Sequence, residues 1–223
     1  MWAPVSCLAN WLKMPDMHRL LDSIRAGESW RSAAGALFGG EGSQGNGAAM
    51  RAAPIGAYFA DDLDSVVLNA RRSASVTHTH PEGIAGAVAV ALAAAWAWRI
   101  RDGLPRSASG FLDLVLPLVP ESQVKERIRH ARNLPDNATV QLAVAALGNG
   151  LGLTAVDTVP FALWCAAQHL DDYEQALWVT VSGLGDRDTT CAIVGGIVAL
   201  SPGAESIPMD WLAAREPLPG WIQ

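Results

Sequence analysis

Apolar residues recur at three- and four-residue spacing along most of this chain, which is the pattern of amphipathic helices. Alternation of apolar and polar residues at period two, which would indicate strands, is scarce. Clusters of Gly and Pro separate the apolar stretches and indicate short loops between them. The pattern predicts helices over residues 17–26, 47–59, 63–76, 82–101, 122–132, 140–147, 158–170, 173–182 and 189–200.

Small residues dominate the faces that these helices would bury. Ala87, Ala89 and Ala91 belong to the longest predicted helix, and Gly195 and Gly196 belong to the last one. Helix axes approach each other more closely where the side chains at the contact are small. Neither a change in composition nor an internal repeat divides the chain. We therefore predict an all-α fold, a compact single domain over residues 1–223.

Composition narrows the classes of partner. Of the 223 residues, 50% are hydrophobic and 17% are charged, which suits a chain that buries one large core. A net charge of -6 argues against nucleic acid as the main partner. The longest uncharged run, between Glu82 and Arg99, is shorter than the roughly 20 residues that span a bilayer and is rich in alanine. It predicts a buried core helix, and we expect no membrane partner.

The cysteines and the N-terminus bear on localisation. Cys7, Cys165 and Cys191 lack the paired spacing of a metal site. Cys165 and Cys191 lie in apolar helical runs, so we predict reduced core residues. The first 12 residues lack the basic region and small-residue cleavage pattern of a signal peptide. These features predict a cytoplasmic protein.

The strongest candidate for chemistry is the segment 185–190. Asp186 and Asp188 are separated by one residue, and the hydroxyl of Thr189 follows directly. Such a compact oxygen cluster suits hard cations such as Mg²⁺ or Mn²⁺. The apolar run that follows would place the carboxylates at a helix N-terminus, where the dipole favours negative charge. Helix capping alone would explain the same residues, so both interpretations stay open.

A glycine-rich segment, residues 39–47, precedes the second predicted helix. Glycines allow left-handed backbone and expose amides, as in loops that bind phosphate. Ser43 and Asn46 add hydrogen-bonding side chains that a plain linker would not need. Arg51, one turn later, could pair with a phosphate or with a buried carboxylate. The alternative is a flexible surface loop.

Two polar segments favour helix capping over chemistry. His78 and His80 alternate, but no third soft ligand is near them in the sequence. Capping by Thr79 or His80, directly before Pro81, is the simpler interpretation. The acidic run 61–64 is likewise predicted to cap a helix on a solvated face.

Four ordered segments together resemble the ADP-ribosylglycohydrolase family. The segment 42–54 is similar to the family's Gly-Asn-Gly-Ala-x-Met-Arg block, and residues 77–81 are similar to its Thr-His block. The segments 157–164 and 185–193 match its last two blocks, in the same order. The resemblance covers about residues 20–212.

This resemblance implies an all-helical hydrolase with two divalent ions, Mg²⁺ or Mn²⁺, at the base of a cleft that holds ADP-ribose. The partner would be ADP-ribose or an ADP-ribosylated protein, with hydrolysis at the anomeric carbon of the ribose. By matching position, the metal ligands would be Asp186, Asp188 and Thr189. The residues that line the substrate would be Gly42, Ser43, Gly45, Asn46 and His78.

The chain departs from the family pattern at its start. The family has an N-terminal Gly-Asp-x-x-Gly segment and then a Thr-Asp-Asp that supplies the other half of the metal site. Nothing ahead of the glycine loop matches them, and Asp61-Asp62 follows that loop with Ala60 in place of Thr. We therefore expect a chain truncated at the N-terminus, similar to the C-terminal two-thirds of a member, with the catalytic acidic residue unknown.

Whether such a chain is active is open, and two other functions remain. One is a non-enzymatic descendant that binds ADP-ribose or has a structural role, with Asp186 and Asp188 as helix caps. The other is a metal-dependent phosphohydrolase, because paired carboxylates and a phosphate-binding loop serve that chemistry equally well.

Overall fold

The computed structural model describes residues 15–101 and 107–217, so Cys7 and the start of the chain lie outside the described residues. Within these two ranges the regular elements are α-helices and short 3-10 helices, and an isolated β-bridge joins Gly45 to Thr154. The predicted all-α fold is therefore confirmed.

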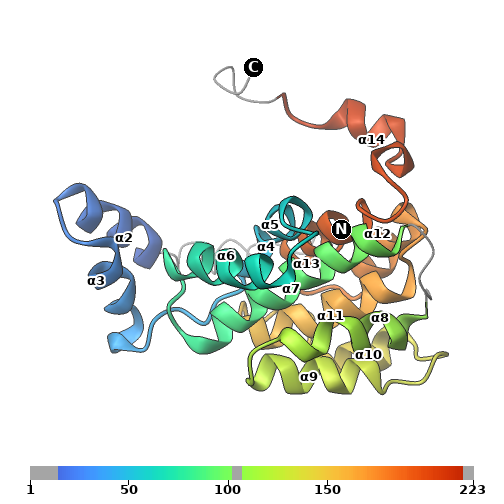
Figure 1. The fold of residues 1–223 in the computed structure, drawn as a ribbon, viewed down its shortest axis with the longest axis horizontal. Helices are drawn as coiled ribbons and strands as arrows, with labels where there is room; N and C mark the ends of the chain where they lie inside the picture. Colours follow the sequence, from blue (N-terminus) through green and yellow to red (C-terminus); the bar gives the residue numbers. More distant parts are fainter. Residues whose placement is uncertain (1–14, 102–106, 218–223) are drawn as a thin grey trace, which may run out of the picture.

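The elements follow one another with short connections (Figure 1). The first half of the chain forms α2 (Pro15–Arg25), α3 (Trp30–Gly35), η1 (Leu37–Gly40), α4 (Gly47–Met50), α5 (Ala53–Tyr58), α6 (Leu63–Ser75) and α7 (Pro81–Ile100). The second half forms α8 (Ala108–Val115), η2 (Leu116–Leu118), α9 (Gln123–Arg132), α10 (Val140–Leu147), α11 (Ala155–Gln168), α12 (Tyr173–Ser182), α13 (Arg187–Val198), η3 (Ala204–Ser206) and α14 (Met209–Ala214).

One predicted helix is divided in two. The apolar pattern predicted a continuous helix over 47–59, whereas the chain forms α4 and α5 with a break at Arg51 and Ala52. Pro54 explains the break, because its ring would clash with the carbonyl of Met50 in a continuous helix. At the start of α5 the same proline is tolerated. The helices α3, α8 and α14, of six to eight residues, were not predicted from the sequence.

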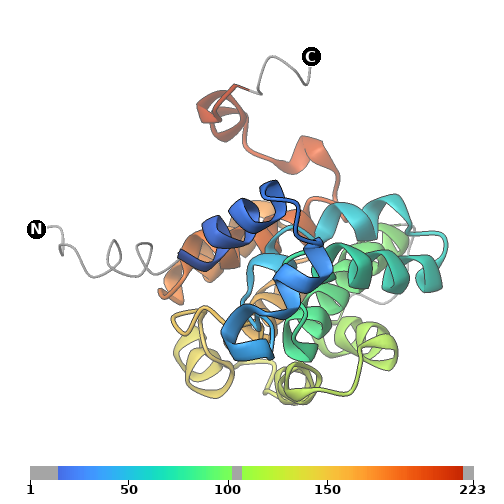
Figure 2. The same ribbon diagram turned by 90° about the vertical axis from the view of Figure 1, so that its left-hand side faces the viewer.

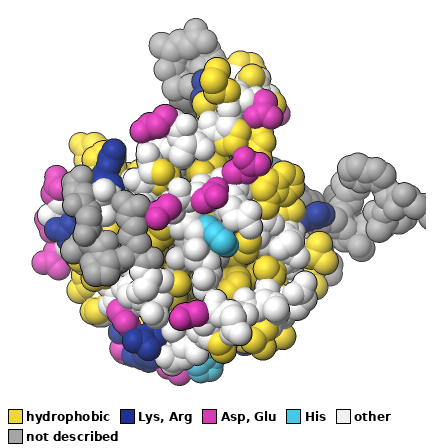
Figure 3. Space-filling model, turned by 90° about the vertical axis from the view of Figure 1, so that its right-hand side faces the viewer, with side chains coloured by type: hydrophobic (Ala, Val, Ile, Leu, Met, Phe, Trp, Pro, Cys, Tyr) yellow, Lys and Arg dark blue, Asp and Glu magenta, His cyan; other side chains and the backbone are white. Residues whose placement is uncertain are grey.

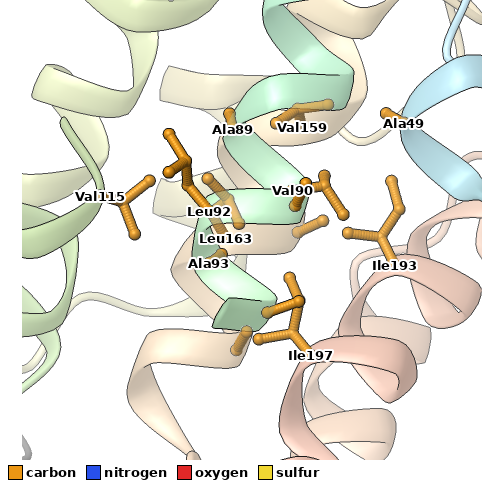
Figure 4. Packing of buried hydrophobic residues seen from close by; sticks show 14 of the residues in the cluster. Ala49, Ala89, Val90, Leu92, Ala93, Val115, Val159, Leu163, Ile193 and Ile197 are labelled. Carbon is orange, nitrogen blue, oxygen red and sulfur yellow. The ribbon is translucent and has the colours of Figure 1, made fainter. Parts of the chain in front are cut away.

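The helix α7 forms the centre of the core. It packs against α4, α5 and α6, against α8 and α9, and against α11 and α13. Figure 4 shows Val90 and Leu92 of α7 among side chains of the surrounding helices, including Leu163 and Ile193. By length and composition α7 could cross a bilayer, but 78% of its most apolar 18-residue stretch is buried inside the protein. The prediction of a buried core helix is confirmed.

Small residues allow the close packing around α7. A Cβ on Gly56 of α5 would collide with the carbonyl oxygen of Ala91, and a Cβ on Gly196 of α13 would lie 2.8 Å from the Cβ of Ala53. Cys165 is buried in the same core, and burial raises the pKa of its thiol to about 12. Cys165 is a core residue as predicted, and its raised pKa makes the thiol unreactive. The same prediction was wrong for Cys191, which is only partly buried.

A helical hairpin lies on one side of the molecule, and a surface of mixed acidic and hydrophobic side chains lies on the other. The helices α2 and α3 form a hairpin around a small separate cluster of Leu20, Ala33 and Ala34. Figure 2 shows this hairpin in front of the helical body. On the opposite side of the molecule, acidic side chains are mixed with hydrophobic ones (Figure 3). The loops that precede α4, α7, α11 and α13 carry the residues of the candidate site.

Candidate functional site

Two glycine-rich loops lie side by side at the candidate site. One is residues 42–47, directly before α4, which we call the first glycine loop, and the other is residues 148–154, directly before α11, which we call the second glycine loop. The backbone N–H of Asn46 donates to the carbonyl of Leu153 at 3.0 Å, and the N–H of Ala155 donates to the carbonyl of Gln44 at 2.9 Å. These bonds form the β-bridge and hold the two loops in register.

The Asn46 side chain connects three segments that are remote in sequence. Its Nδ2 donates to Thr158 Oγ1 at 2.9 Å and to Asp186 Oδ2 at 2.7 Å. Asn46 and Thr158 are both buried, so the bond between them is shielded from water, whereas the bond to Asp186 is partly buried. The contact brings a predicted substrate-binding residue and a predicted metal ligand, 140 residues apart, into one site.

The two acidic residues of the segment 185–190 lie together at the start of α13. Asp186 is the N-cap of this helix, and its Oδ1 accepts a hydrogen bond from the N–H of Thr189 at 3.4 Å. The side chains of Asp186 and Asp188 are close enough that each shifts the pKa of the other. The predicted capping role and the predicted carboxylate pair therefore occur together.

Electrostatics at this pair favour a positive charge. Burial and the adjacent Asp188 raise the pKa of Asp186, while the neighbouring Asp186 side chain lowers the pKa of Asp188. Two carboxylates this close cannot both be charged without cost, so a proton or a cation between them is favourable. Thr189 is buried beside them and forms a side-chain hydrogen bond to Asp186.

These donors fit a hard divalent cation, because all of them are oxygens. They supply only part of a coordination shell. Over residues 15–101 and 107–217, no three His, Cys, Asp or Glu side chains come together as a metal-binding group. Asp62 is engaged elsewhere: it caps α6 and accepts hydrogen bonds from the N–H groups of Asp64 and Ser65. The capping prediction for the run 61–64 is thus confirmed.

His78 lies beneath the first glycine loop, with 5% of its surface exposed. A Cβ on Gly45 would lie 3.2 Å from His78 Nε2, and a Cβ on Gly47 would lie 3.5 Å from the same atom. Its Nδ1 is 2.7 Å from Thr77 Oγ1. Burial, and then the charge of Arg51, lower the pKa of His78 to about 4, so the imidazole is neutral at pH 7.

The other residues of this region form a tight support. Ser43 is buried, and its Oγ accepts from the N–H of Gly45 at 3.2 Å. Gly42 has a φ of 77°, and a Cβ there would collide with Thr79. His80 is the N-cap of α7, and its Nδ1 accepts from the N–H of Glu82 at 3.1 Å. Capping by His80 is therefore confirmed.

The second glycine loop was missed as part of the site. Its Asn149 carbonyl accepts from the N–H of Asp186 at 3.2 Å, and the Asn149 side chain donates to the carbonyl of Gly183 at 3.0 Å. Gly150 has a φ of 87°, and a Cβ there would lie 2.8 Å from the Cβ of Asp186. A signal was present in the sequence, because residues 148–150 repeat the Gly-Asn-Gly of residues 45–47.

Comparison with known proteins agrees with the four ordered segments. The family model described as ADP-ribosylglycohydrolase matches residues 5–223. The chain is 29% identical to the ADP-ribosylhydrolase ARH3 of Danio rerio over an alignment of 211 residues, with 81% of this chain and 55% of that protein covered. The ARH3 of Homo sapiens is also 29% identical, over an alignment of 207 residues, with 81% of this chain and 56% of that protein covered.

One further relative has a higher sequence identity to this chain. An uncharacterized protein of Archaeoglobus fulgidus is 35% identical over 200 residues, which cover 89% of this chain and 60% of that protein. The chain thus spans between about 55% and 60% of the length of the curated relatives described here.

Proposed function

Because this chain belongs to the ADP-ribosylglycohydrolase family, we propose that it binds an ADP-ribosyl group and serves in the hydrolysis of its bond to an acceptor. The family generally depends on divalent metal ions. For this chain we propose Mg²⁺ or Mn²⁺, and we propose ADP-ribose or an ADP-ribosylated protein as its partner. The contact between Asn46 and Asp186 carries the proposal, since it joins the two halves of the candidate site.

We propose that the first glycine loop holds the diphosphate of the ligand. Gly42 takes up the left-handed conformation that shapes the loop, and Ser43 and Gly45 are bound to each other within it. Such loops present backbone N–H groups to anions. His78 lies against the loop from below, which would place a neutral imidazole beside the bound phosphates.

Asp186, Asp188 and Thr189 would hold the metal ion. When bound, the ion would orient ribose hydroxyls and a water molecule at the anomeric carbon. The protein's own contribution is to hold the carboxylate of Asp186 in a fixed orientation. Asn46 donates to one of its oxygens and the N–H of Thr189 donates to the other. Among the described residues we assign no general acid or base, so the proposal names no residue for proton transfer.

A binding experiment tests this proposal without requiring turnover. Titration calorimetry with ADP-ribose is carried out with Mn²⁺ and with a chelator, and thermal unfolding is followed over a range of Mn²⁺ concentrations. Binding at a hundredfold excess over Kd stabilises a protein by about 2.7 kcal/mol. Asp188→Asn should remove the Mn²⁺-dependent shift, because it replaces a charged ligand. Asp136→Asn, a change at an exposed aspartate, is the matched control.

The outcomes separate the candidate functions. Release of free ADP-ribose from a modified protein supports the hydrolase, and release of inorganic phosphate supports a phosphohydrolase instead. ADP-ribose binding without either product supports a binding protein. Folded protein that gives no heat with ADP-ribose in either condition would contradict the proposed function.

A further inference from the structure

Arg51 lies beside the candidate site and is hydrogen-bonded to three segments that surround it. Its Nη1 donates to the carbonyl of Gly47 at 3.1 Å. Its Nη2 donates to the carbonyl of Ser73 at 3.0 Å and to Thr77 Oγ1 at 2.7 Å. The guanidinium group therefore joins the start of α4, the last turn of α6 and the segment that leads into α7.

The hydrogen bond from Arg51 constrains the hydroxyl of Thr77. A guanidinium group only donates, so Thr77 Oγ1 must accept from it. A hydroxyl has one hydrogen, and His78 Nδ1 lies 2.7 Å from this oxygen. If Nδ1 carried a hydrogen instead, the hydroxyl would accept twice, and its own hydrogen would lack an acceptor among the described residues. Donation from the hydroxyl to His78 Nδ1 satisfies all three groups without water, and the bond from Arg51 would increase the donor strength of the hydroxyl.

A neutral imidazole carries one N–H, so an acceptor at Nδ1 places the hydrogen on Nε2. His78 Nε2 faces Gly45 and Gly47 of the first glycine loop. It forms no hydrogen bond to the described residues. It is also not among the fully buried polar atoms without a partner, which are Trp96 Nε1, Trp164 Nε1 and Ser201 Oγ. His78 Nε2 is therefore a free donor at the loop, with some access to solvent.

We propose that Arg51 and Thr77 are positioning residues, which hold His78 as its Nε2–H tautomer so that it donates a hydrogen bond to the anion bound by the first glycine loop. This inference rests on the proposed function for the identity of the anion, the diphosphate of ADP-ribose. The opposite tautomer would turn a lone pair of Nε2 toward the phosphate oxygens and repel them. Arg51 thus acts on the ligand without touching it.

The tautomer can be measured directly and without ligand. Nitrogen–proton correlation spectra of ¹⁵N-histidine-labelled protein at pH 7 report which ring nitrogen of His78 is protonated. We expect Nε2–H in the unmodified protein and in Thr77→Ser, which keeps the hydroxyl. Thr77→Val and Arg51→Gln should instead show a mixture of tautomers. Arg72→Gln, on an exposed arginine at the end of α6, should leave the spectrum unchanged.

The same proteins are then titrated with ADP-ribose. Loss of one hydrogen bond to a charged group should weaken binding by about tenfold or more in Thr77→Val and Arg51→Gln, with normal affinity in Thr77→Ser. An Nδ1–H tautomer in the unmodified protein would overturn the proposal. So would unchanged affinity in Thr77→Val despite an altered tautomer. Failure of all proteins to bind ADP-ribose would contradict the proposed function, while the spectra would still decide the tautomer and its dependence on Arg51.

Discussion

Acidification tests the burial of His78. Its pKa is lowered from 6.5 to about 4 in the folded protein, first by burial and then by the charge of Arg51. In the unfolded chain the imidazole regains an ordinary pKa of about 6.5. Between these two values the unfolded state binds a proton that the folded state excludes. Folding stability contributed by neutral His78 is therefore complete above pH 6.5 and is lost as the pH falls toward 4.

The expected loss of folding stability follows from the pKa shift of His78. One pKa unit corresponds to 1.36 kcal/mol, so the full shift would amount to about 3 kcal/mol below pH 4. At pH 5 the unfolded state is already mostly protonated and the folded state mostly neutral, and the loss relative to pH 7.5 is about 2 kcal/mol. This is a large part of the stability of an ordinary domain.

Urea unfolding at pH 5 and pH 7.5 measures the loss. We compare the unmodified protein with His78→Gln, which removes the titrating group, so that the contribution of other ionisable residues cancels. The unmodified protein should lose about 2 kcal/mol more than the variant. His130→Gln, at an exposed histidine on α9, should retain the pH dependence of the unmodified protein.

A second measurement avoids any effect of the substitution on folding. The Cε1 proton of His78 in the unmodified protein should keep its neutral chemical shift down to about pH 5, as its pKa of about 4 requires. A resonance that titrates near pH 6.5, or equal pH dependence in His78→Gln and the unmodified protein, would refute the argument from burial.

Three substitutions test the supports of the site and the core. Glu82→Gln should cost about 2 kcal/mol in urea unfolding, since the carboxylate accepts two backbone N–H bonds at the start of α9, at 2.9 Å each, and the amide keeps one acceptor. Gly56→Ala should lower the free energy of unfolding by about 1–3 kcal/mol, because the new Cβ would collide with the carbonyl of Ala91; stability equal to the unmodified protein would show that α5 can move away from α7. Gly150→Ala places a Cβ at a φ of 87° and 2.8 Å from that of Asp186, so it should weaken the Mn²⁺-dependent thermal shift more than it lowers stability in a chelator.

The positions of most helices could be predicted from local sequence alone. The spacing of apolar residues, the flanking Gly and Pro, and capping residues such as Asp62 and His80 act within one or two turns. The acidic pair, Asp186 and Asp188, was also visible in the sequence, because two carboxylates one residue apart and followed by a hydroxyl form a recognisable oxygen cluster. The helices α3 and α14 were missed, since six residues carry too little periodicity to be distinguished from loops. Length does not explain the miss of α8, which is as long as the correctly predicted α10.

Which segments come together at the candidate site depends on tertiary structure. The hydrogen bond between Asn46 and Asp186 spans 140 residues, and the bond from Arg51 to Thr77 depends on how α4 meets the end of α6. The second glycine loop belongs to the site only because α11 and α13 pack side by side against α7. Periodicity and composition determine which stretches form helices and which faces they bury. They do not determine which loops meet, because that is decided by the packing of the whole core around α7.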